Sequence, residues 1–137
     1  FLVVDKKGKL EIKITNVGLS KAKFLEVELQ NSASYDVLSS NKVYIGDLES
    51  NDFDTASFDA LVKIPGNVIF PITLTYRDAR NNQIVETKSV TVKSYTQDEA
   101  QKLGLVSKSN SFFYMSVIVI LVIVWFVWRK IKKRKKS

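Results

Sequence analysis

Apolar and polar side chains alternate along most of the first 94 positions, a pattern typical of strands that bury one face. Leu10, Ile12 and Ile14, for example, are separated by Glu11 and Lys13. The same alternation or a short apolar run returns at these positions: Leu25, Val27 and Leu29; Tyr35 and Val37; Val43 to Ile45; Phe53 to Val62; Ile72, Leu74 and Tyr76; Ile84, Val85, Val90 and Val92. About seven short strands without a long helix between them predict an all-β fold, an immunoglobulin-like antiparallel β-sandwich. A β-barrel is the alternative architecture.

Residues that favour turns separate the expected strands. Asn16-Val17-Gly18 breaks the first strand and Gly46-Asp47 ends the fourth. The stretch from Arg77 to Asn82 is expected to turn, because Asn tolerates a positive φ and Asp caps its own backbone. Pro65-Gly66 marks another connection. Pro71 is expected at a strand start or a sheet edge, because it cannot donate a backbone hydrogen bond.

The composition limits the chemistry that the chain can perform. With no Cys and no His, the chain has no disulfide framework, no thiol nucleophile and no His-based triad, and the common zinc ligands are missing. No nucleophile elbow, phosphate-binding loop or dinucleotide fingerprint occurs. We therefore expect neither an enzyme nor a bound cofactor. The apolar share of the first 111 residues is that of a folded domain with one core.

A second apolar segment follows this domain. Residues 112–128 read FFYMSVIVILVIVWFVW and carry no charge. A helix of this length spans roughly 25 Å, at the short end of the transmembrane range. Aromatic side chains mark its two ends, as in a membrane-interface belt, and the anchoring residues are Phe112, Phe113, Tyr114, Trp125 and Trp128. The segment predicts one transmembrane helix that anchors the chain, and a buried core element is the alternative.

The net charge of +7 is concentrated behind that segment. Residues 129–137 hold seven of the 21 basic residues, whereas the first 111 residues hold 14 basic and 14 acidic ones. The seven basic residues are Arg129, Lys130, Lys132, Lys133, Arg134, Lys135 and Lys136. By the positive-inside rule this tail is cytoplasmic, and the N-terminal domain is extracellular or lumenal.

The tail also indicates partners. Each basic side chain near an anionic leaflet contributes roughly 1 kcal/mol, so we expect contact with membrane lipids. RNA at a ribosome surface is the alternative partner of the tail, and we expect no DNA partner. The location is then the cell membrane or, in a eukaryote, the endoplasmic-reticulum membrane, for which the ending KRKKS has the form of a retrieval signal.

A short helix is expected before the span. Thr96-Gln97-Asp98-Glu99 has the form of a capping box, and Gly104 supplies a stop. The domain plan is therefore a sandwich over 1–94, a juxtamembrane helix and linker over 95–111, the span over 112–128 and a basic tail over 129–137. The juxtamembrane stretch is interpreted as a spacer, with a partner-contacting helix as the alternative.

Three segments of the sandwich follow the order of a known family. They are ITNVGLSKAKFLEVEL (14–29), VYIGDLESND (43–52) and ITLTYRDARNNQ (72–83). This order resembles the CARDB and S-layer-related β-sandwich domains of archaeal and bacterial surface proteins. The chain departs from it at Asn51-Asp52, where the family often has Pro-Gly, and at Asn81-Asn82, where it often has Gly-Asn. The resemblance implies an extracytoplasmic, non-enzymatic module for spacing, adhesion or partner contact.

Five acidic residues lie close together in the sequence. They are Asp47, Glu49, Asp52, Asp54 and Asp59. Closely spaced oxygen ligands suit Ca²⁺, but the order of an EF-hand loop is missing. We interpret them as a solvated acidic face, with a cation site as the alternative, and we expect no metal.

Two functions fit these features. The first is a membrane-anchored binding or structural module whose sandwich, or juxtamembrane helix, contacts a protein partner outside the cytoplasm. The second is an accessory single-pass subunit of a membrane complex, such as a protein-translocation or transport machine. In that case the sandwich contacts the complex, and the basic tail contacts lipid or the ribosome.

Overall fold

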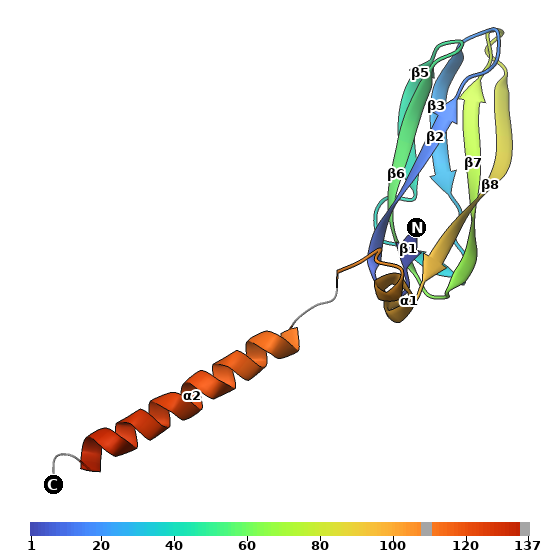
Figure 1. Ribbon diagram of the computed structural model, residues 1–137. Helices are drawn as coiled ribbons and strands as arrows, with labels where there is room; N and C mark the ends of the chain where they lie inside the picture. The colour runs from blue at the N-terminus through green and yellow to red at the C-terminus, as the bar shows by residue number, and fades with distance from the viewer. Residues whose placement is uncertain (108–110, 135–137) are drawn as a thin grey trace. The chain divides into compact units, whose positions relative to one another are not determined.

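The computed structural model describes residues 1–107 and 111–134, except for the side chains of 111–114, 126–127 and 129–134. The chain divides into two compact units, Phe1–Lys102 and Leu103–Ser137, and each is described by itself (Figure 1). The first unit contains the strands and a short helix, α1 (Gln97–Lys102), and the second contains a long helix, α2 (Ser111–Arg134).

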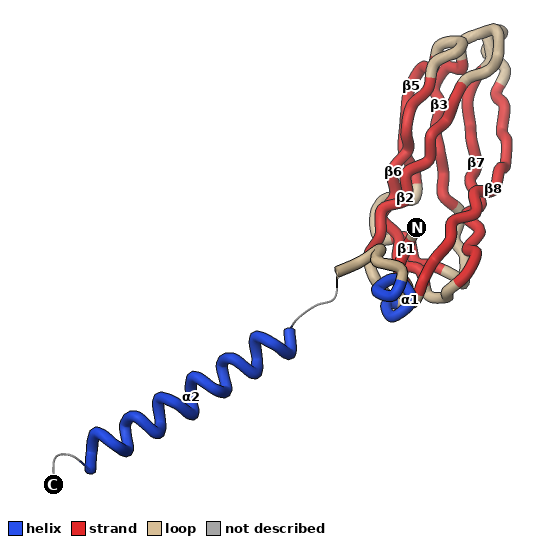
Figure 2. Tube along the Cα trace, in the orientation of Figure 1, coloured by secondary structure: helices blue, strands red, loops and turns tan. Residues whose placement is uncertain are grey.

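Within residues 1–107, eight strands form two sheets (Figure 2). The strands are β1 (Leu2–Val3), β2 (Lys7–Thr15), β3 (Ala22–Leu29), β4 (Tyr35–Val37), β5 (Lys42–Leu48), β6 (Phe53–Val62), β7 (Gly66–Arg77) and β8 (Gln83–Tyr95). One sheet has the order β1-β8-β7-β3-β5 and the other the order β2-β6-β4. From β1 to β7, consecutive strands belong alternately to the larger and the smaller sheet. The two sheets are therefore the two layers of a sandwich. The predicted immunoglobulin-like β-sandwich is confirmed, and the β-barrel alternative is wrong.

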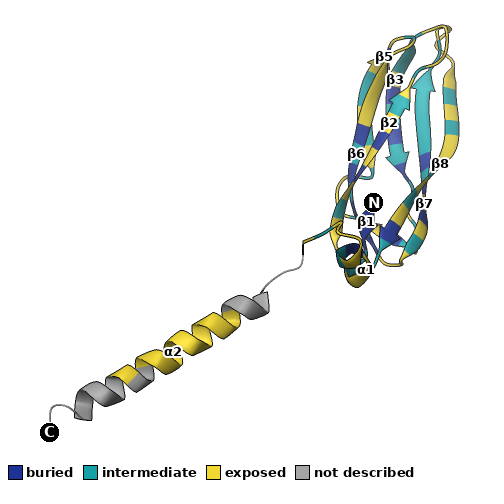
Figure 3. Cartoon of the chain, in the orientation of Figure 1, coloured by how far each residue is buried: buried dark blue, intermediate teal, exposed yellow. Residues whose placement is uncertain are grey.

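The core lies between the two sheets, where the alternating apolar residues meet. In the smaller sheet, Leu10 pairs with Phe58 and Ile12 with Ala56 in an antiparallel register that keeps apolar side chains on one face. The larger sheet contributes the facing layer: Val27, Leu29, Val68, Phe70 and Ile72. Figure 3 shows these buried positions along β2, β3, β6 and β7. The alternation read from the sequence therefore identified the buried faces of β2 and β3, whereas β6 was read only as an apolar run, without a buried face, and the buried Val68 and Phe70 of β7 were not part of the predicted pattern.

Tyr35 closes the core at the end of the sandwich that carries α1. Its ring lies 4.4 Å from that of Phe70, centroid to centroid, and its hydroxyl donates a hydrogen bond to the carbonyl of Gln30. This bond compensates for burying a polar atom, and burial raises the pKa of Tyr35.

Three boundaries differ from the sequence prediction. β1, which the alternation does not reveal, is a two-residue strand parallel to β8. β5 continues through Gly46 to Leu48, because Gly46 adopts a φ of 94° and makes an irregularity in the ladder with β3 rather than an end.

The third difference concerns Pro71, which lies inside β7, a central strand, rather than at a strand start or an edge. Its carbonyl accepts a hydrogen bond from the amide of Gln30, just beyond the end of β3. The N–H and C=O groups of a strand residue point to the same side of the strand. The position of the missing N–H of Pro71 is therefore also directed towards Gln30, just beyond the last residue of β3. Proline therefore costs the sheet no ladder bond here.

The predicted capping box is confirmed at the start of α1. The amide of Thr96 donates to Glu99 Oε2 at 3.0 Å, and the amide of Glu99 donates to Thr96 Oγ1 at 3.3 Å. The first of these bonds lowers the pKa of Glu99, so the box holds at neutral pH and weakens as the pH falls through that lowered value. Ala100 is fully buried, so α1 belongs to the first compact unit.

Replacing Thr96 with Ala is expected to destabilise α1 by about 1 kcal/mol, because the Glu99 amide loses its acceptor. Hydrogen–deuterium exchange of the amides of Ala100 to Lys102 measures the effect as faster exchange. Thr91→Ala is the matched control, since this exposed side chain lies on β8. Equal exchange in both variants would show that the box does not hold the helix.

Candidate functional site

A cleft of about 420 Å³ opens at the end of the sandwich opposite α1, between the end of β2, the β2–β3 loop and the β7–β8 hairpin. Its apolar lining comes from both sheets: Ile14, Leu25, Leu48, Leu74 and Ile84. From the β7–β8 turn, Asp78 also reaches the lining. A cleft of this size is within the range of ligand-binding pockets.

The polar side of the cleft is organised around Glu86. Tyr76 donates its hydroxyl to Glu86 Oε1 at 2.8 Å, and Lys88 Nζ lies 3.2 Å from Glu86 Oε2. The Tyr76 hydrogen bond is the main cause that lowers the pKa of Glu86, and the same bond raises the pKa of Tyr76. The cleft therefore presents an apolar floor beside a carboxylate that stays ionised at neutral pH.

The β2–β3 loop beside the cleft is tied down by Asn16. Its side-chain amide donates to the carbonyls of Ser20 at 2.9 Å and Leu48 at 3.0 Å, while its Oδ1 accepts from the amide of Gly18 at 3.0 Å. Ser50 adds a hydrogen bond from its hydroxyl to the Gly18 carbonyl at 2.6 Å. These bonds reach the loop from both β5 and the β5–β6 connection, so the loop has a defined conformation.

Two apolar side chains project from this tied loop into solvent. Val17 is 85% exposed and Leu19 is 102% exposed. An exposed apolar side chain alone means little, but two on a braced loop beside an apolar cleft indicate a contact surface. We call Val17, Leu19 and the cleft the loop-end surface.

The loop-end surface was not predicted from the sequence. Asn16-Val17-Gly18 was interpreted as a strand break, and the signal that was available is the apolar Val17 and Leu19 on either side of a turn glycine. Tyr76 and Glu86 carried no sequence signal, because their proximity depends on the β7–β8 register, in which Leu74 is opposite Glu86.

The acidic residues that suggested a cation site do not converge. Lys21 lies 2.6 Å from Glu49 and 3.6 Å from Asp47, and these contacts, with Glu49 as the larger cause, raise the pKa of Lys21. Asp59 pairs with Lys7 at 2.9 Å on the other sheet. Asp52 and Asp54 each accept the amide of the following residue. Among the described residues, no three metal-binding side chains lie close enough to hold an ion. The cation-site alternative thus gains no support, and these residues lie on the solvated surface.

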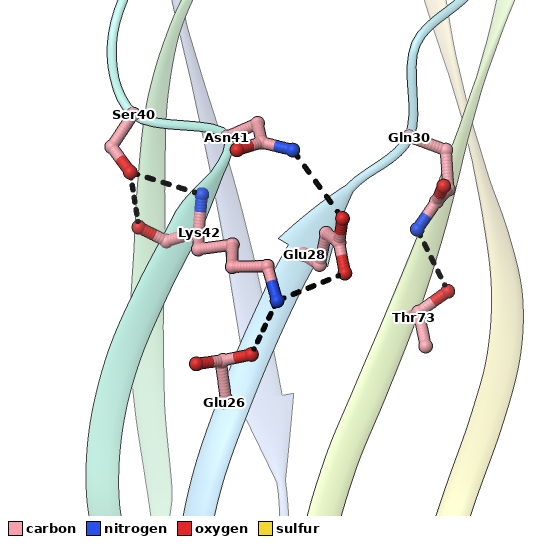
Figure 4. A network of polar contacts seen from close by, with 7 residues as sticks. All are labelled: Glu26, Glu28, Gln30, Ser40, Asn41, Lys42 and Thr73. Atoms are coloured by element: carbon pink, nitrogen blue, oxygen red, sulfur yellow. Dashed lines mark hydrogen bonds and ion pairs between the residues drawn. The ribbon is translucent and has the colours of Figure 1, made fainter.

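A network of polar side chains lies on the outer face of the larger sheet, across β3, β5 and β7 (Figure 4). Lys42 bridges Glu26 at 3.0 Å and Glu28 at 3.4 Å across β3 and β5, and the two carboxylates raise its pKa. Gln30 donates to Thr73 Oγ1 at 3.1 Å in the same sheet. Exposed pairs of this kind contribute little to the stability of the fold.

The predicted anchor residues lie on α2 in the second unit. Trp125 and Trp128 are 53% and 66% exposed, while the side chains of Phe112, Phe113 and Tyr114 lie outside the described residues. The side chains of Arg129, Lys130, Lys132, Lys133 and Arg134, and the whole of Lys135 and Lys136, also lie outside them. In the part of the chain that is described, no helix is both long enough and apolar enough to cross a membrane. The transmembrane helix over 112–128 therefore stays a sequence prediction without structural support.

Comparisons with known proteins add little. No protein-family model matches the chain, and no curated protein matches it. Among solved structures, it is similar to SSP-19, an MSP-domain protein like family member of Caenorhabditis elegans, at 10% identity and a TM-score of 0.42 over 68% of this chain and 91% of that one. It is also similar to the ArnB paralog VWA2 from Sulfolobus acidocaldarius, at 17% identity and a TM-score of 0.37 over 61% of this chain and 22% of that one.

These likenesses are too distant to carry an argument about function. The immunoglobulin-like sandwich rests on the chain's own strand order and register. The resemblance to CARDB and S-layer-related domains is not confirmed at the level of a family, because no family model matches.

Proposed function

We propose that the chain is a membrane-anchored, non-enzymatic binding module whose sandwich contacts a protein partner through the loop-end surface. The observation that carries this proposal is the pair of exposed apolar side chains, Val17 and Leu19, on a loop braced by Asn16. A braced loop loses little conformational freedom on binding, so more of the contact energy becomes affinity. Glu86 and Lys88 at the edge of the cleft supply polar groups that orient a partner.

The absence of an enzymatic role is part of the proposal. The sequence holds no His and no Cys, which removes the commonest general base and the strongest side-chain nucleophile. Among the ionisable groups that line the cleft, Tyr76 and Lys88 both contact Glu86, and the Tyr76 hydrogen bond is the main cause that lowers the pKa of Glu86. A lowered pKa is the reverse of what a carboxyl group needs to act as a general acid at neutral pH.

The anchor is proposed from the sequence. The apolar run over 112–128 and the seven basic residues behind it support a span with a cytoplasmic tail and an external sandwich. The accessory-subunit function is the second candidate, and the same tail favours it, because a polybasic segment can contact ribosomal RNA as well as lipid.

Photo-crosslinking from the loop-end surface tests this proposal. With benzoylphenylalanine in place of Leu19, we expect irradiation of membranes from the cells that make the chain to yield a discrete protein adduct. Adding Val17→Ser is expected to reduce the yield several-fold. Ile64 is the matched control position, since it is an apolar residue, 45% exposed, in the β6–β7 connection at the opposite end of the sandwich.

The identity of the adduct separates the two functions. An adduct with an envelope or surface protein supports the binding module, and one with a translocation or transport subunit supports the accessory subunit. Equal adducts from positions 19 and 64, or none from position 19, would contradict the loop-end surface as the contact site.

A further inference from the structure

β8 is an edge strand with most of its outer edge unpaired. β1 covers it at Ser94 and Tyr95, and the paired positions of β1 are Leu2 and Val3. The carbonyl of Tyr95 accepts the amide of Val4 on the β1 side. Because N–H and C=O groups alternate sides along a strand, the odd-numbered residues direct both groups to this outer edge. These residues, before β1 begins, are Gln83, Val85, Thr87, Ser89, Thr91 and Lys93.

The other edges of the sandwich are protected in familiar ways. β5 is irregular around Gly46, and β4 has three residues. β2 places charged side chains at alternate positions, from Lys7 to Lys13. β8, in contrast, pairs with β7 in unbroken register from Gly66 to Arg77 and contains no proline. Natural proteins rarely leave so long and regular an edge without a partner.

The sequence of this edge matches itself in one antiparallel register. When Thr87 is placed opposite Thr87 of a second copy, Glu86 lies opposite Lys88, and Ile84 opposite Val90. The remaining pairs are Val85 with Ser89 and Gln83 with Thr91. The odd-numbered residues form the hydrogen-bonded pairs, as the direction of their free groups requires, and the even-numbered residues face the cleft side of both copies.

We propose that two copies of this chain associate through antiparallel pairing of β8 about a two-fold axis at Thr87. The two larger sheets then form one continuous sheet. A two-fold axis repeats every contact, so the interface holds two Glu86–Lys88 pairs and two Ile84–Val90 pairs. The paired segment, Gln83 to Thr91, ends before Ser94, where β1 begins, so the two pairings do not overlap.

Charge and polarity select this register over its neighbours. A two-fold axis at Ser89 places Glu86 opposite Val92 and Lys88 opposite Val90, which leaves both charges facing apolar residues. An axis at Val85 places Glu86 opposite Ile84. The register centred on Thr87 pairs charge with charge and apolar with apolar, which is the arrangement that stabilises cross-strand neighbours.

Single-cysteine crosslinking tests the register, since the chain has no cysteine of its own. In the full chain in detergent, Thr87→Cys is expected to form a covalent dimer under mild oxidation, because hydrogen-bonded partners lie about 5.5 Å apart between Cα atoms, within disulfide range. Thr91→Cys is the control, with its two copies about 27 Å apart, and Ser89→Cys, about 14 Å apart, tests the neighbouring register. Stronger crosslinking at position 89 or 91 than at 87 would overturn the proposal.

A charge swap tests the chemistry. Glu86→Lys and Lys88→Glu each convert two attractive pairs into two repulsive ones, so each is expected to weaken the dimer roughly tenfold or more. The double variant Glu86→Lys with Lys88→Glu restores opposite charges and is expected to recover the dimer. Analytical ultracentrifugation in density-matched detergent measures the association. A monomeric unmodified chain, or a double variant as weak as the single ones, would overturn the proposal and favour an extended peptide of another protein as the occupant of this edge.

Discussion

Phe70→Ala is expected to lower the free energy of unfolding of the sandwich by about 3–5 kcal/mol. Phe70 is fully buried, and its ring lies 4.4 Å from that of Tyr35. It sits on β7, which is bonded to β8 on one side and β3 on the other, so the backbone cannot move to fill the cavity without disturbing both neighbours. The free energy of unfolding of a domain of this size is about 5–15 kcal/mol in total, so the variant loses a large share of its stability.

Pulse proteolysis of the full chain across a urea series measures this loss as a shift of the unfolding midpoint. Proteolysis is preferable to tryptophan fluorescence, because both Trp residues lie in α2. Ile69→Ala is the matched control: Ile69 is the preceding residue of β7 but is 56% exposed on the opposite face. The Ile69→Ala substitution is expected to lower the free energy of unfolding by less than about 1 kcal/mol. Similar midpoints for the two variants would show that the core does not lie between the sheets.

The local features of this fold could be predicted from the sequence because the interactions that form them are local. The strand around Leu10 and Ile12 is defined by its own alternation, and the capping box of Thr96 and Glu99 spans one helical turn. The turn before Asn82 follows likewise from Asp78, whose carboxylate accepts the amides of Arg80 and Asn82. Those bonds, the one from Asn82 first, hold the pKa of Asp78 below its usual value.

The features that depend on strand order could not be predicted. Glu86 meets Tyr76 because β7 and β8 form a hairpin in one register, and Lys42 meets Glu26 and Glu28 because β5 lies beside β3. The five acidic residues looked like a cluster in the sequence, yet in the fold Asp59 faces Lys7 in the smaller sheet while Glu49 pairs with Lys21. The free edge of β8 likewise follows from the sheet order, which places β1 beside its last two residues.

Neutralising the tail is expected to destroy the fixed orientation that we propose for the chain. The seven basic residues of 129–137 provide the charge difference across residues 112–128, because the first 111 residues have no net charge. With all seven replaced by Ser or Gln, the tail carries no basic residue, whereas Lys93, Lys102 and Lys108 remain on the N-terminal flank, so the charge bias that favours a cytoplasmic tail is removed. The positive-inside rule then predicts a mixed population of chains in place of one orientation.

Cysteine labelling measures this orientation directly, because any cysteine introduced into the chain is the sole thiol. Ser39→Cys reports the side of the sandwich and Ser137→Cys the side of the tail. An impermeant maleimide reaches only the outer side of intact cells or sealed microsomes. Outside cells it is expected to label the sandwich but not the tail, and outside microsomes, whose lumen would hold the sandwich, it is expected to label the tail but not the sandwich. In cells, therefore, position 39 reacts at once and position 137 reacts after permeabilisation, whereas the neutral-tail variant is expected to react at both positions in part.

A charge-preserving variant separates charge from side-chain chemistry. Replacing the five tail lysines with Arg keeps all seven positive charges, so the orientation is expected to be that of the unmodified chain, since the rule counts Lys and Arg alike. If the neutral-tail variant labelled as the unmodified chain does, orientation would be set elsewhere in the chain. If position 137 of the unmodified chain reacted first from outside the cell, the sandwich would face the cytoplasm, and the partner sought through the loop-end surface would have to be a cytoplasmic one.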